Sequence, residues 1–445
     1  MSTPRLGGTD EAYLLLESTV GVVAPMQLVV VLDEDPGDDV VHDLVDRLVG
    51  GPLDRAVRRP VVPGARPRWV RPPGPASARV DTTPVDDPAA WAQRHLAQAP
   101  VAVVDSRGWQ VATVALTGGG RAVSVVASHV LADGRRFVET VADAVTASDG
   151  PAADLLPHRD PGPVRRVVAD AADAASAVAD AVRAARRLRG NRPGASASAS
   201  AAAAGSAPTR PVRARDDSVD DVPAHHVVTL DRARWHAAAR DHGGTATTLL
   251  VALGVGLARH SGVVAARGGG DGPVRVTVAV DRRGEGDTAT ANTAGGVALS
   301  LPVDPTPDTG LDDARAGIRA ALSIPPGDDA VARVARLLPT RVLGRVVASI
   351  PGPDVAVSQL GPAPEGLLSW RGAQARTVLV RAAARSAAPH LASRMLPGVA
   401  VWAVEHGDAI TVTACAVDPV ARTDIAQSVE RELERWGLRV DARSG

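Results

Sequence analysis

The sequence predicts an α+β protein of two lobes, in which mixed sheets and packed helices flank a cleft. Its 445 residues are enough for two or three domains of ordinary size, or for one fused unit of two lobes. Both halves mix strand patterns of period two with helical patterns of period 3.6. Between them, residues 191–222 are rich in Ala, Ser and Pro and lack apolar periodicity. We therefore expect a first lobe over 1–190, a flexible linker over 191–222 and a second lobe over 223–445.

In the first half, strands are expected where apolar residues alternate or run on for about eight residues. They are 25–33, 109–116 and 121–128, the last two forming a hairpin around the turn "TGGG". Helices are expected where Val and Leu recur at helical spacing: 38–49, 88–98, the segment from 135 onward and 162–189. Residues 60–75, rich in Pro and Arg, are expected to form a loop.

The expected helix over 162–189 is rich in alanine and carries arginines at both ends. Two interpretations fit this pattern. It is a packing helix with a solvated arginine face, or a basic helix that rests on an anionic membrane surface.

The second half repeats the same mixture of elements. The expected strands are 225–230, 273–280, 297–303, 353–362, and segments near 375–381, 398–405 and 408–416. The expected helices are 231–241, 245–260, 310–322, 329–347 and 419–436.

Composition argues against several classes of function. With 49 basic and 50 acidic residues, no bulk charge favours a nucleic-acid partner, and the low aromatic content leaves few platforms for stacked bases. All basic side chains are arginine, which we attribute to coding bias. The single cysteine, Cys415, excludes an internal disulfide framework and a Cys-rich zinc site, and we interpret it as a buried strand residue.

The N-terminal residues lack the charged start and apolar stretch of a signal peptide. The longest apolar stretch, 248–258, is too short to span a bilayer. We therefore expect a cytoplasmic protein, or one bound peripherally to the inner face of the plasma membrane.

One stretch carries chemistry: "ASHVLADGRRF" over 127–137, where an expected strand gives way to a helix. A neutral His129 at the end of that strand could accept the proton of an attacking hydroxyl. Asp133 could orient the imidazole, or form a structural ion pair that holds the loop, with Arg282 or Arg283 as partner. Gly134 would let the backbone turn sharply into the helix and leave amide groups free near a developing oxyanion.

Several blocks resemble the bacterial wax ester synthase/diacylglycerol acyltransferase family. These are "TDEAYLLLE" followed by "PMQLVVVLDEDP", "SRGWQVATVALTGGGRAVSVVASHVLADG", "RVTVAVDRRGEGDTATANTAGGVALSLPV" and "VAVSQLGP", in the family's order and spread over nearly the whole chain. The resemblance implies a fold of two lobes like those of chloramphenicol acetyltransferase and of peptide-synthetase condensation domains. It also implies that His129 is the general base and that Asn292 and Arg282 support the site.

The chain departs from this family pattern at several positions. The family's first motif histidine is Ser128, its Asn–Asp pair is Thr247 and Thr248, and the Asn of its Ser-Asn block is Gln359. Ser128 still offers a hydroxyl in place of the lost histidine. Together, the departures point to an altered substrate or a weakly active or inactive paralogue.

The resemblance implies an O-acyltransferase that moves a long-chain acyl group from acyl-coenzyme A to diacylglycerol or a fatty alcohol. The product is triacylglycerol or a wax ester, and no metal, covalent acyl-enzyme or further cofactor is needed. The expected partners are acyl-coenzyme A, a lipid hydroxyl acceptor and a membrane or lipid-droplet surface. Two alternatives stay open: a condensation-type enzyme that takes its acyl group from a carrier protein, and a non-catalytic lipid-binding protein. The adjacent His225 and His226 are expected to be ordinary strand residues.

Overall fold

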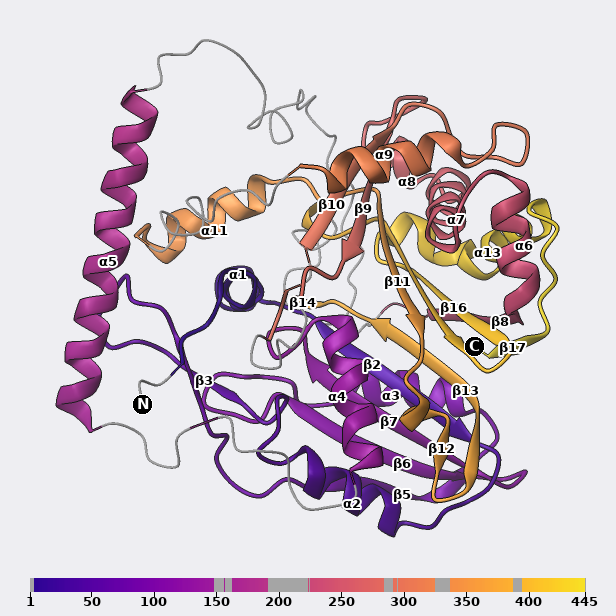
Figure 1. Cartoon of the computed structure of the whole chain (residues 1–445), viewed down its shortest axis with the longest axis horizontal. Coiled ribbons are helices and arrows are strands. Elements are labelled where there is room, and N and C mark those ends of the chain that lie inside the picture. Colours follow the sequence, from indigo (N-terminus) through magenta and orange to yellow (C-terminus); the bar gives the residue numbers. More distant parts are fainter. Residues whose placement is uncertain are drawn as a thin grey trace.

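A computed structural model describes residues 4–147, 156, 162–190, 223, 225–283, 291–293, 295–324, 337–386 and 394–444. Within these ranges the chain forms two lobes, each built around one large sheet (Figure 1). The expected linker, 191–222, lies outside the described residues. The α+β class and the two lobes expected from the sequence are confirmed.

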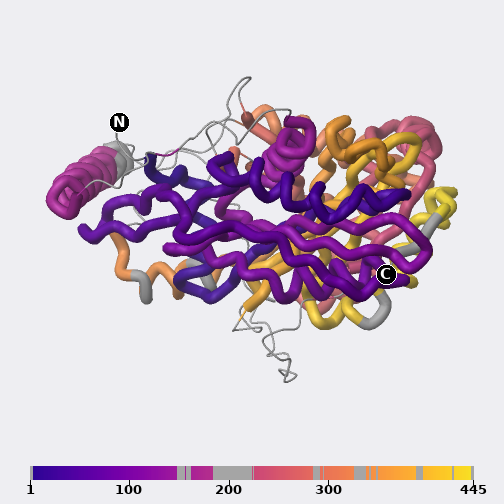
Figure 2. The backbone as a smooth tube through the Cα atoms, turned by 90° about the horizontal axis from the view of Figure 1, so that it is seen from below, coloured from indigo at the N-terminus to yellow at the C-terminus, as the bar shows by residue number. Residues whose placement is uncertain are grey.

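The first sheet has six strands in the order β12-β13-β2-β7-β6-β5. Their bounds are β2 Pro25–Leu32, β5 Ala78–Val85, β6 Trp109–Leu116, β7 Arg121–Ser128, β12 Ser369–Trp370 and β13 Ala373–Ala382. All neighbours are antiparallel except β5 and β6, which are parallel. Figure 2 shows these strands lying side by side. The predicted hairpin of β6 and β7 is present, with Trp109 opposite Ala127.

Helices cover both faces of this sheet. Side chains of α2 (Asp39–Leu48) and α4 (Gly134–Thr146) share one core with Leu28 and Val30 of β2. Side chains of α3 (Pro88–Gln98) pack on the other face with Val29 and Val31. Because successive strand residues point to opposite faces, β2 is buried along its whole length.

One strand of the first sheet comes from the second half of the chain. Residues of β13 pair antiparallel with β2, with Val378 opposite Val30. The expected second lobe over 223–445 is therefore wrong for the segment 369–382, which completes the sheet of the first lobe. Its alternating pattern predicted a strand correctly, but such a pattern does not specify the partner strand.

The second sheet has seven strands in the order β10-β9-β11-β15-β16-β8-β17. Their bounds are β8 His225–Asp231, β9 Val274–Val280, β10 Gly295–Leu301, β11 Val355–Pro362, β15 Val399–His406, β16 Ala409–Ala416 and β17 Ala442–Ser444. One face of the sheet shares a core with α6 Arg232–Asp241, α7 Ala246–His260, α9 Asp312–Leu322 and α13 Ile425–Arg435. Gly254 lets α7 approach this sheet, because a Cβ there would lie 2.6 Å from Val355.

Shorter elements connect and flank the two sheets. They are α1 Gly8–Leu15, the π-helical turn η1 Leu16–Val20, β1 Val22–Val23, β3 Ala56–Arg58, β4 Arg68–Val70, α5 Pro163–Gly190, α8 Val263–Ala266, α11 Thr340–Ser349, the 3₁₀ turns η2 Glu365–Leu367 and η3 Pro419–Asp424, and β14 Arg385–Ser386. None of the helices in the described part of the chain combines the length and the apolar character needed to cross a bilayer.

Two expectations about single elements need correction. Strand β5 was not expected, because it is an edge strand with a proline and little burial, so its apolar pattern is weak. Strand β4 interrupts the stretch 60–75, which we expected to be a loop. The expected helix 329–347 lies partly outside the described residues, and its visible part is α11.

A buried polar network lies on the face of the first sheet that α3 covers. Gln27 donates to the Ser124 hydroxyl at 2.7 Å, and Ser124 lies 2.8 Å from Nδ1 of His95. The guanidinium of Arg381 donates to Gln27 at 2.6 Å. Arg381 is 1 % exposed and forms no ion pair within the described residues.

Candidate active site

His129 directly follows β7, a central strand of the first sheet. Its backbone N–H donates to the carbonyl of Ala24, and a turn closed by the N–H of Leu131 on the carbonyl of Ser128 follows. Helix α4 then begins at Gly134. Backbone hydrogen bonds therefore hold His129 in place between the end of a central strand and the start of a helix.

The imidazole of His129 is stacked on Tyr13 of α1, the only tyrosine of the chain. The ring centroids are 4.1 Å apart and the planes are 16° from parallel. The Tyr13 hydroxyl lies 3.3 Å from Nε2 of His129. Burial raises the pKa of Tyr13 to about 12, so this hydroxyl keeps its proton near pH 7. In the tautomer of the neutral ring whose lone pair is on Nε2, the Tyr13 hydroxyl donates to that atom.

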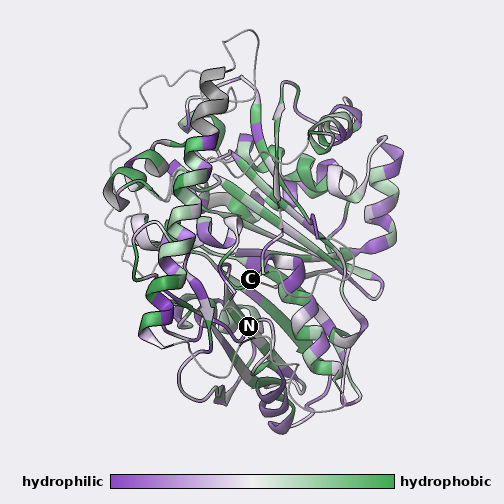
Figure 3. Cartoon of the chain, turned by 60° about the vertical axis from the view of Figure 1, so that its left-hand side comes forward, coloured by the Kyte–Doolittle hydropathy of each residue, from purple (hydrophilic) through white to green (hydrophobic). Residues whose placement is uncertain are grey.

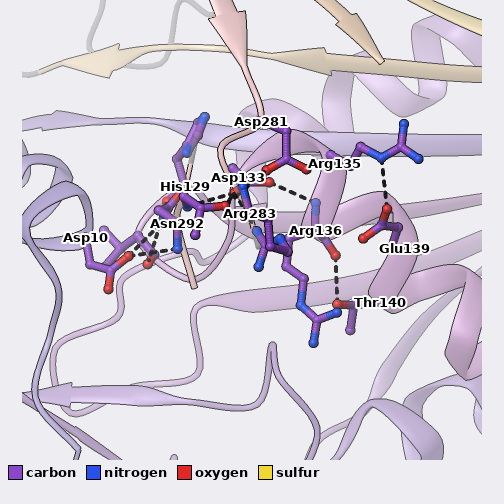
Figure 4. Close-up of polar contacts among 12 residues, drawn as sticks. Asp10, His129, Asp133, Arg135, Arg136, Glu139, Thr140, Asp281, Arg283 and Asn292 are labelled. Atoms are coloured by element: carbon purple, nitrogen blue, oxygen red, sulfur yellow. Dashed lines mark hydrogen bonds and ion pairs between the residues drawn. The ribbon is translucent and has the colours of Figure 1, made fainter. Parts of the chain in front are cut away.

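Asn292, between β9 and β10 of the second lobe, ties the histidine loop to α1 (Figure 4). Its side-chain amide donates to the carbonyls of His129 at 2.9 Å and Val130 at 3.1 Å. The same amide and the Asn292 backbone donate to the carboxylate of Asp10 at 2.9 and 3.1 Å. Burial raises the pKa of Asp10, and the hydrogen bonds from Asn292 oppose that shift. One asparagine thus joins three parts of the chain that are remote in sequence.

Burial lowers the pKa of His129 below its ordinary value of 6.5, while the charge of Asp133 and the Asn292 side chain act in the opposite direction. The ring is therefore neutral near pH 7, the form that accepts a proton. Its Nδ1 atom is buried and has no hydrogen-bond partner within the described residues. Nε2, beside Tyr13, is the atom available for proton transfer.

Asp133 anchors the second lobe and does not hydrogen-bond the imidazole (Figure 4). One of its carboxylate oxygens accepts from the N–H of Arg136 and caps α4. The other accepts from the Arg283 guanidinium at 2.7 Å and from the Thr293 N–H at 3.0 Å. Its side chain is 1 % exposed. Of the two roles considered for Asp133, the geometry matches the ion pair that holds the loop.

The structure places the other predicted supporting residues differently from the expectation. Arg282 is exposed and packs beside Gly295, while its neighbour Arg283 forms the ion pair. Gly134 lies at the first turn of α4 without a left-handed backbone, and a Cβ there would come within 3.3 Å of Leu360. Close packing between the lobes, and not a sharp turn, therefore explains this glycine.

Ser128 is 1 % exposed, and its hydroxyl accepts from the N–H of Val130 at 3.2 Å. It closes its own turn and does not contact the imidazole. Thr248 forms a reciprocal cap with Thr245 at the start of α7. Gln359, on β11, lies 3.5 Å from the carboxylate of Glu405. Ser128, Thr248 and Gln359 therefore each have a hydrogen-bond partner other than the imidazole of His129.

Sequence reasoning did not identify Tyr13 or Asp10 as site residues, although both lie in the block "TDEAYLLLE" that carried the family resemblance. The signal for Tyr13 was its uniqueness in a chain almost free of aromatic residues. Asp10 and Thr293 gave no signal, because their contacts with Asn292 and Asp133 form only when the two lobes meet.

His225 and Cys415, the other residues considered for chemistry, are buried on strands of the second sheet. His225 lies on β8, with Nδ1 3.1 Å from Gln93 and Nε2 2.9 Å from the carbonyl of Ala382. Cys415 is buried on β16, and burial raises the pKa of its thiol to about 12, so it is a poor nucleophile.

Solved structures with this fold span nearly the whole chain. A wax ester synthase/diacylglycerol acyltransferase from Marinobacter aquaeolei is 15% identical, with a TM-score of 0.56, over 97% of this chain and 98% of that one. The first condensation domain of the CDA synthetase is 15% identical, with a TM-score of 0.56, over 98% and 96%. Polyketide synthase associated protein 5 from Mycobacterium tuberculosis is 14% identical, with a TM-score of 0.55, over 97% and 96%.

No family model matches the chain, and no curated protein matches it significantly. The structural likeness confirms the fold that the sequence resemblance implied, as a divergent version of the two-lobed condensation-type architecture. At these identities the likeness concerns the fold alone.

Proposed function

We propose that the protein is an acyltransferase in which His129 is the general base. It transfers a long-chain acyl group from acyl-coenzyme A to the hydroxyl of diacylglycerol or a fatty alcohol. The observation that carries the proposal is the state of His129: a neutral imidazole at the end of a central strand, with Nε2 beside the Tyr13 hydroxyl and with both lobes holding its backbone. The shared fold with a wax ester synthase and with condensation domains supports the same class.

In the proposed reaction the acceptor hydroxyl takes the place of the Tyr13 hydroxyl at Nε2 of His129. Nε2 removes the hydroxyl proton while the oxygen attacks the thioester carbonyl carbon. The carbon–sulfur bond then breaks, and the coenzyme A thiolate takes the proton back from the imidazolium. An ester and free coenzyme A are the products, and His129 returns to its neutral form.

The surroundings of His129 suit this cycle. Burial keeps the ring neutral before the reaction, while the nearby Asp133 carboxylate favours the positive charge that the ring carries after it takes the proton. The ion pair of Asp133 with Arg283 and the amide of Asn292 hold the loop in place. Asp133 and Asn292 therefore act as positioning residues, and His129 alone is assigned the catalytic proton transfer.

A carrier-protein donor is the second candidate, because condensation domains of peptide synthetases share the fold. The chemistry at His129 is the same for both donors, since each presents a thioester. A non-catalytic lipid-binding protein is the third, favoured by Ser128 in place of the first motif histidine and by Thr247, Thr248 and Gln359 in place of the polar residues of the family pattern.

The test uses the purified full chain with labelled long-chain acyl-coenzyme A, and separately with an acylated carrier protein. Diacylglycerol or hexadecanol is the acceptor. His129→Ala is compared with His42→Ala, which replaces an exposed histidine of α2. We expect ester formation to fall by about 10²–10⁴-fold in His129→Ala and to stay unchanged in the control.

The possible outcomes distinguish the three candidate functions. Ester formation that survives His129→Ala would overturn the assignment of the base. Turnover with the acylated carrier alone would establish the carrier-protein donor. Binding of acyl-coenzyme A without ester formation from any acceptor would favour the lipid-binding protein.

A further inference from the structure

Helix α5 is attached to the first lobe along one face only. The Asp170 side chain is fully buried and accepts hydrogen bonds from Arg5 at 2.9 Å and from Arg68. Asp173 accepts from the side chain and the backbone of Arg66, each at 2.7 Å. These ion pairs determine which side of α5 faces the protein.

The opposite side of α5 is apolar and exposed. Its large side chains are Val164 at 75%, Val167 at 43%, Val168 at 64%, Val178 at 49% and Val182 at 44% exposure. With 3.6 residues per turn, this stripe lies roughly 140° around the helix from Asp170 and Asp173. Ala171 and Ala175 continue it between the valines. Figure 3 shows apolar residues along much of the length of the helix.

Helix α11 adds a second exposed apolar face at the same end of the molecule (Figure 1). Leu338, Val342, Val346 and Ile350 recur every fourth residue and are 39%, 41%, 47% and 53% exposed. The inner side of α11 buries Leu343.

The chain before α11 reaches α5. A Cβ at Gly64 would lie 3.3 Å from Leu337 and 3.9 Å from Ala174 of α5. We call the exposed apolar side chains of these two regions the α5–α11 surface: Val164, Val167, Val168, Val178, Val182, Leu337, Leu338, Val342, Val346 and Ile350. They are ten of the fifteen large apolar side chains that are exposed among the described residues. Such a concentration on one end of a molecule is typical of an interaction surface.

Arginines flank this surface. Helix α5 contains six arginines, at 165, 166, 183, 186, 187 and 189, against three aspartates. All three aspartates are already paired: Asp170 with Arg5 and Arg68, Asp173 with Arg66, and Asp180 with Arg183. Arg165 near one end and Arg183 toward the other are exposed, as is Arg345 on α11. Exposed arginines therefore occur on the same two helices as the exposed valines.

We propose that the α5–α11 surface docks the protein on an anionic lipid bilayer. Valine and leucine side chains would enter the boundary between headgroups and acyl chains, while the guanidinium groups bind lipid phosphates. A second copy of the chain fits less well. Both ends of α5 are basic, so a twofold pairing of this helix with itself sets arginines against arginines.

The α5–α11 surface is connected to the candidate active site through packed helices. Helix α11 packs on η1, and η1 continues α1, which carries Tyr13 against His129. A lipid acceptor leaving the bilayer at this end meets the elements that hold the base. This part of the inference rests on the proposed function, whereas bilayer binding itself does not.

The test is flotation of the full chain with vesicles of phosphatidylglycerol and phosphatidylcholine, and with vesicles of phosphatidylcholine alone. The docking variant is Val164→Asp/Val168→Asp/Val178→Asp. The matched control, Val303→Asp/Leu322→Asp/Val420→Asp, introduces the same number of charges at side chains that are 49%, 44% and 43% exposed outside this surface. Circular dichroism checks that the helices of each variant are intact.

We expect the wild type to float with the anionic vesicles, and the docking variant to bind at least about tenfold more weakly, since it places charges where apolar contact is needed. The control keeps wild-type binding. Arg165→Gln/Arg183→Gln loses most of the preference for anionic over neutral vesicles.

The proposal is overturned if the wild type does not float with anionic vesicles, or if the control loses as much binding as the docking variant. It is equally overturned if light scattering shows a dimer that the docking variant dissociates, because a second copy then covers the surface. His129→Ala floats like the wild type, so loss of turnover and loss of docking are separate results.

Discussion

Acidification is expected to destabilise the fold through two buried histidines, His95 and His225. His95 on α3 is 2% exposed and lies between the Ser124 hydroxyl at 2.8 Å and the Gln110 side chain at 3.2 Å. Burial lowers its pKa from 6.5 to about 4. Burial, with the charge of Arg381 as a smaller cause, lowers the pKa of His225 to about 3.

The direction of the effect follows from proton binding. Between pH 6.5 and 4, the unfolded chain binds a proton at each of these histidines that the folded protein does not bind. Stability therefore falls as the pH falls through this range. Between pH 7 and pH 5, each histidine removes about 2 kcal/mol from the free energy of unfolding, and the two together about 4 kcal/mol. That is a large part of the stability of an ordinary domain.

The assay is urea unfolding at pH 7 and pH 5 at constant ionic strength, followed by the fluorescence of the seven tryptophans. Carboxylates also titrate in this range, so the wild type is compared with His95→Gln, which keeps an amide in the polar network. We expect the wild type to lose about 2 kcal/mol more than the variant between the two pH values. His42→Gln on the exposed side of α2 serves as the control and should follow the wild type. If His95→Gln loses as much stability as the wild type, the buried neutral histidine does not cause the pH dependence.

Two further predictions concern buried charges. Asp133→Asn removes the carboxylate that pairs with Arg283, so we expect a loss of about 3 kcal/mol in urea unfolding together with reduced ester formation; unchanged values of both would contradict the anchoring role. Arg381→Met replaces a guanidinium that is 1% exposed and donates only to Gln27 among the described residues, so we expect thermal unfolding at the same or a higher temperature. A fall in the free energy of unfolding of more than about 2 kcal/mol would contradict this prediction. It would mean that the guanidinium of Arg381 gains more from its contacts than it loses by being buried.

Sequence patterns predicted most elements of the fold, because burying one face of a helix or strand makes apolar residues recur at a regular spacing. The hairpin of β6 and β7 and the helix after His129 follow from alternation, turn residues and helical spacing. Such patterns are weak where little is buried, which is why the edge strand β5 was not expected. They also carry no information about pairing, so the place of β13 beside β2 could not be predicted.

The candidate site, like the fold, could be predicted only in part. His129 could be predicted as a base from its place at a strand end, and Asp133 from its place before a helix. The choice of Arg283 over Arg282 could not be predicted, since adjacent residues on a loop point in different directions and only the approach of the second lobe selects one.

The sequence alone was enough to predict the α+β class, to single out His129 as the candidate base and to carry the resemblance that implied the two-lobed fold, because these depend on local pattern and spacing. Only the tertiary structure decided that Tyr13 stacks on His129 and that Asn292 joins Asp10 to the histidine loop. It also decided that the valines of α5 are exposed and not packed in a core. Each of these depends on which segments, far apart in the chain, are brought together when apolar surface is buried, and short-range periodicity does not encode that choice.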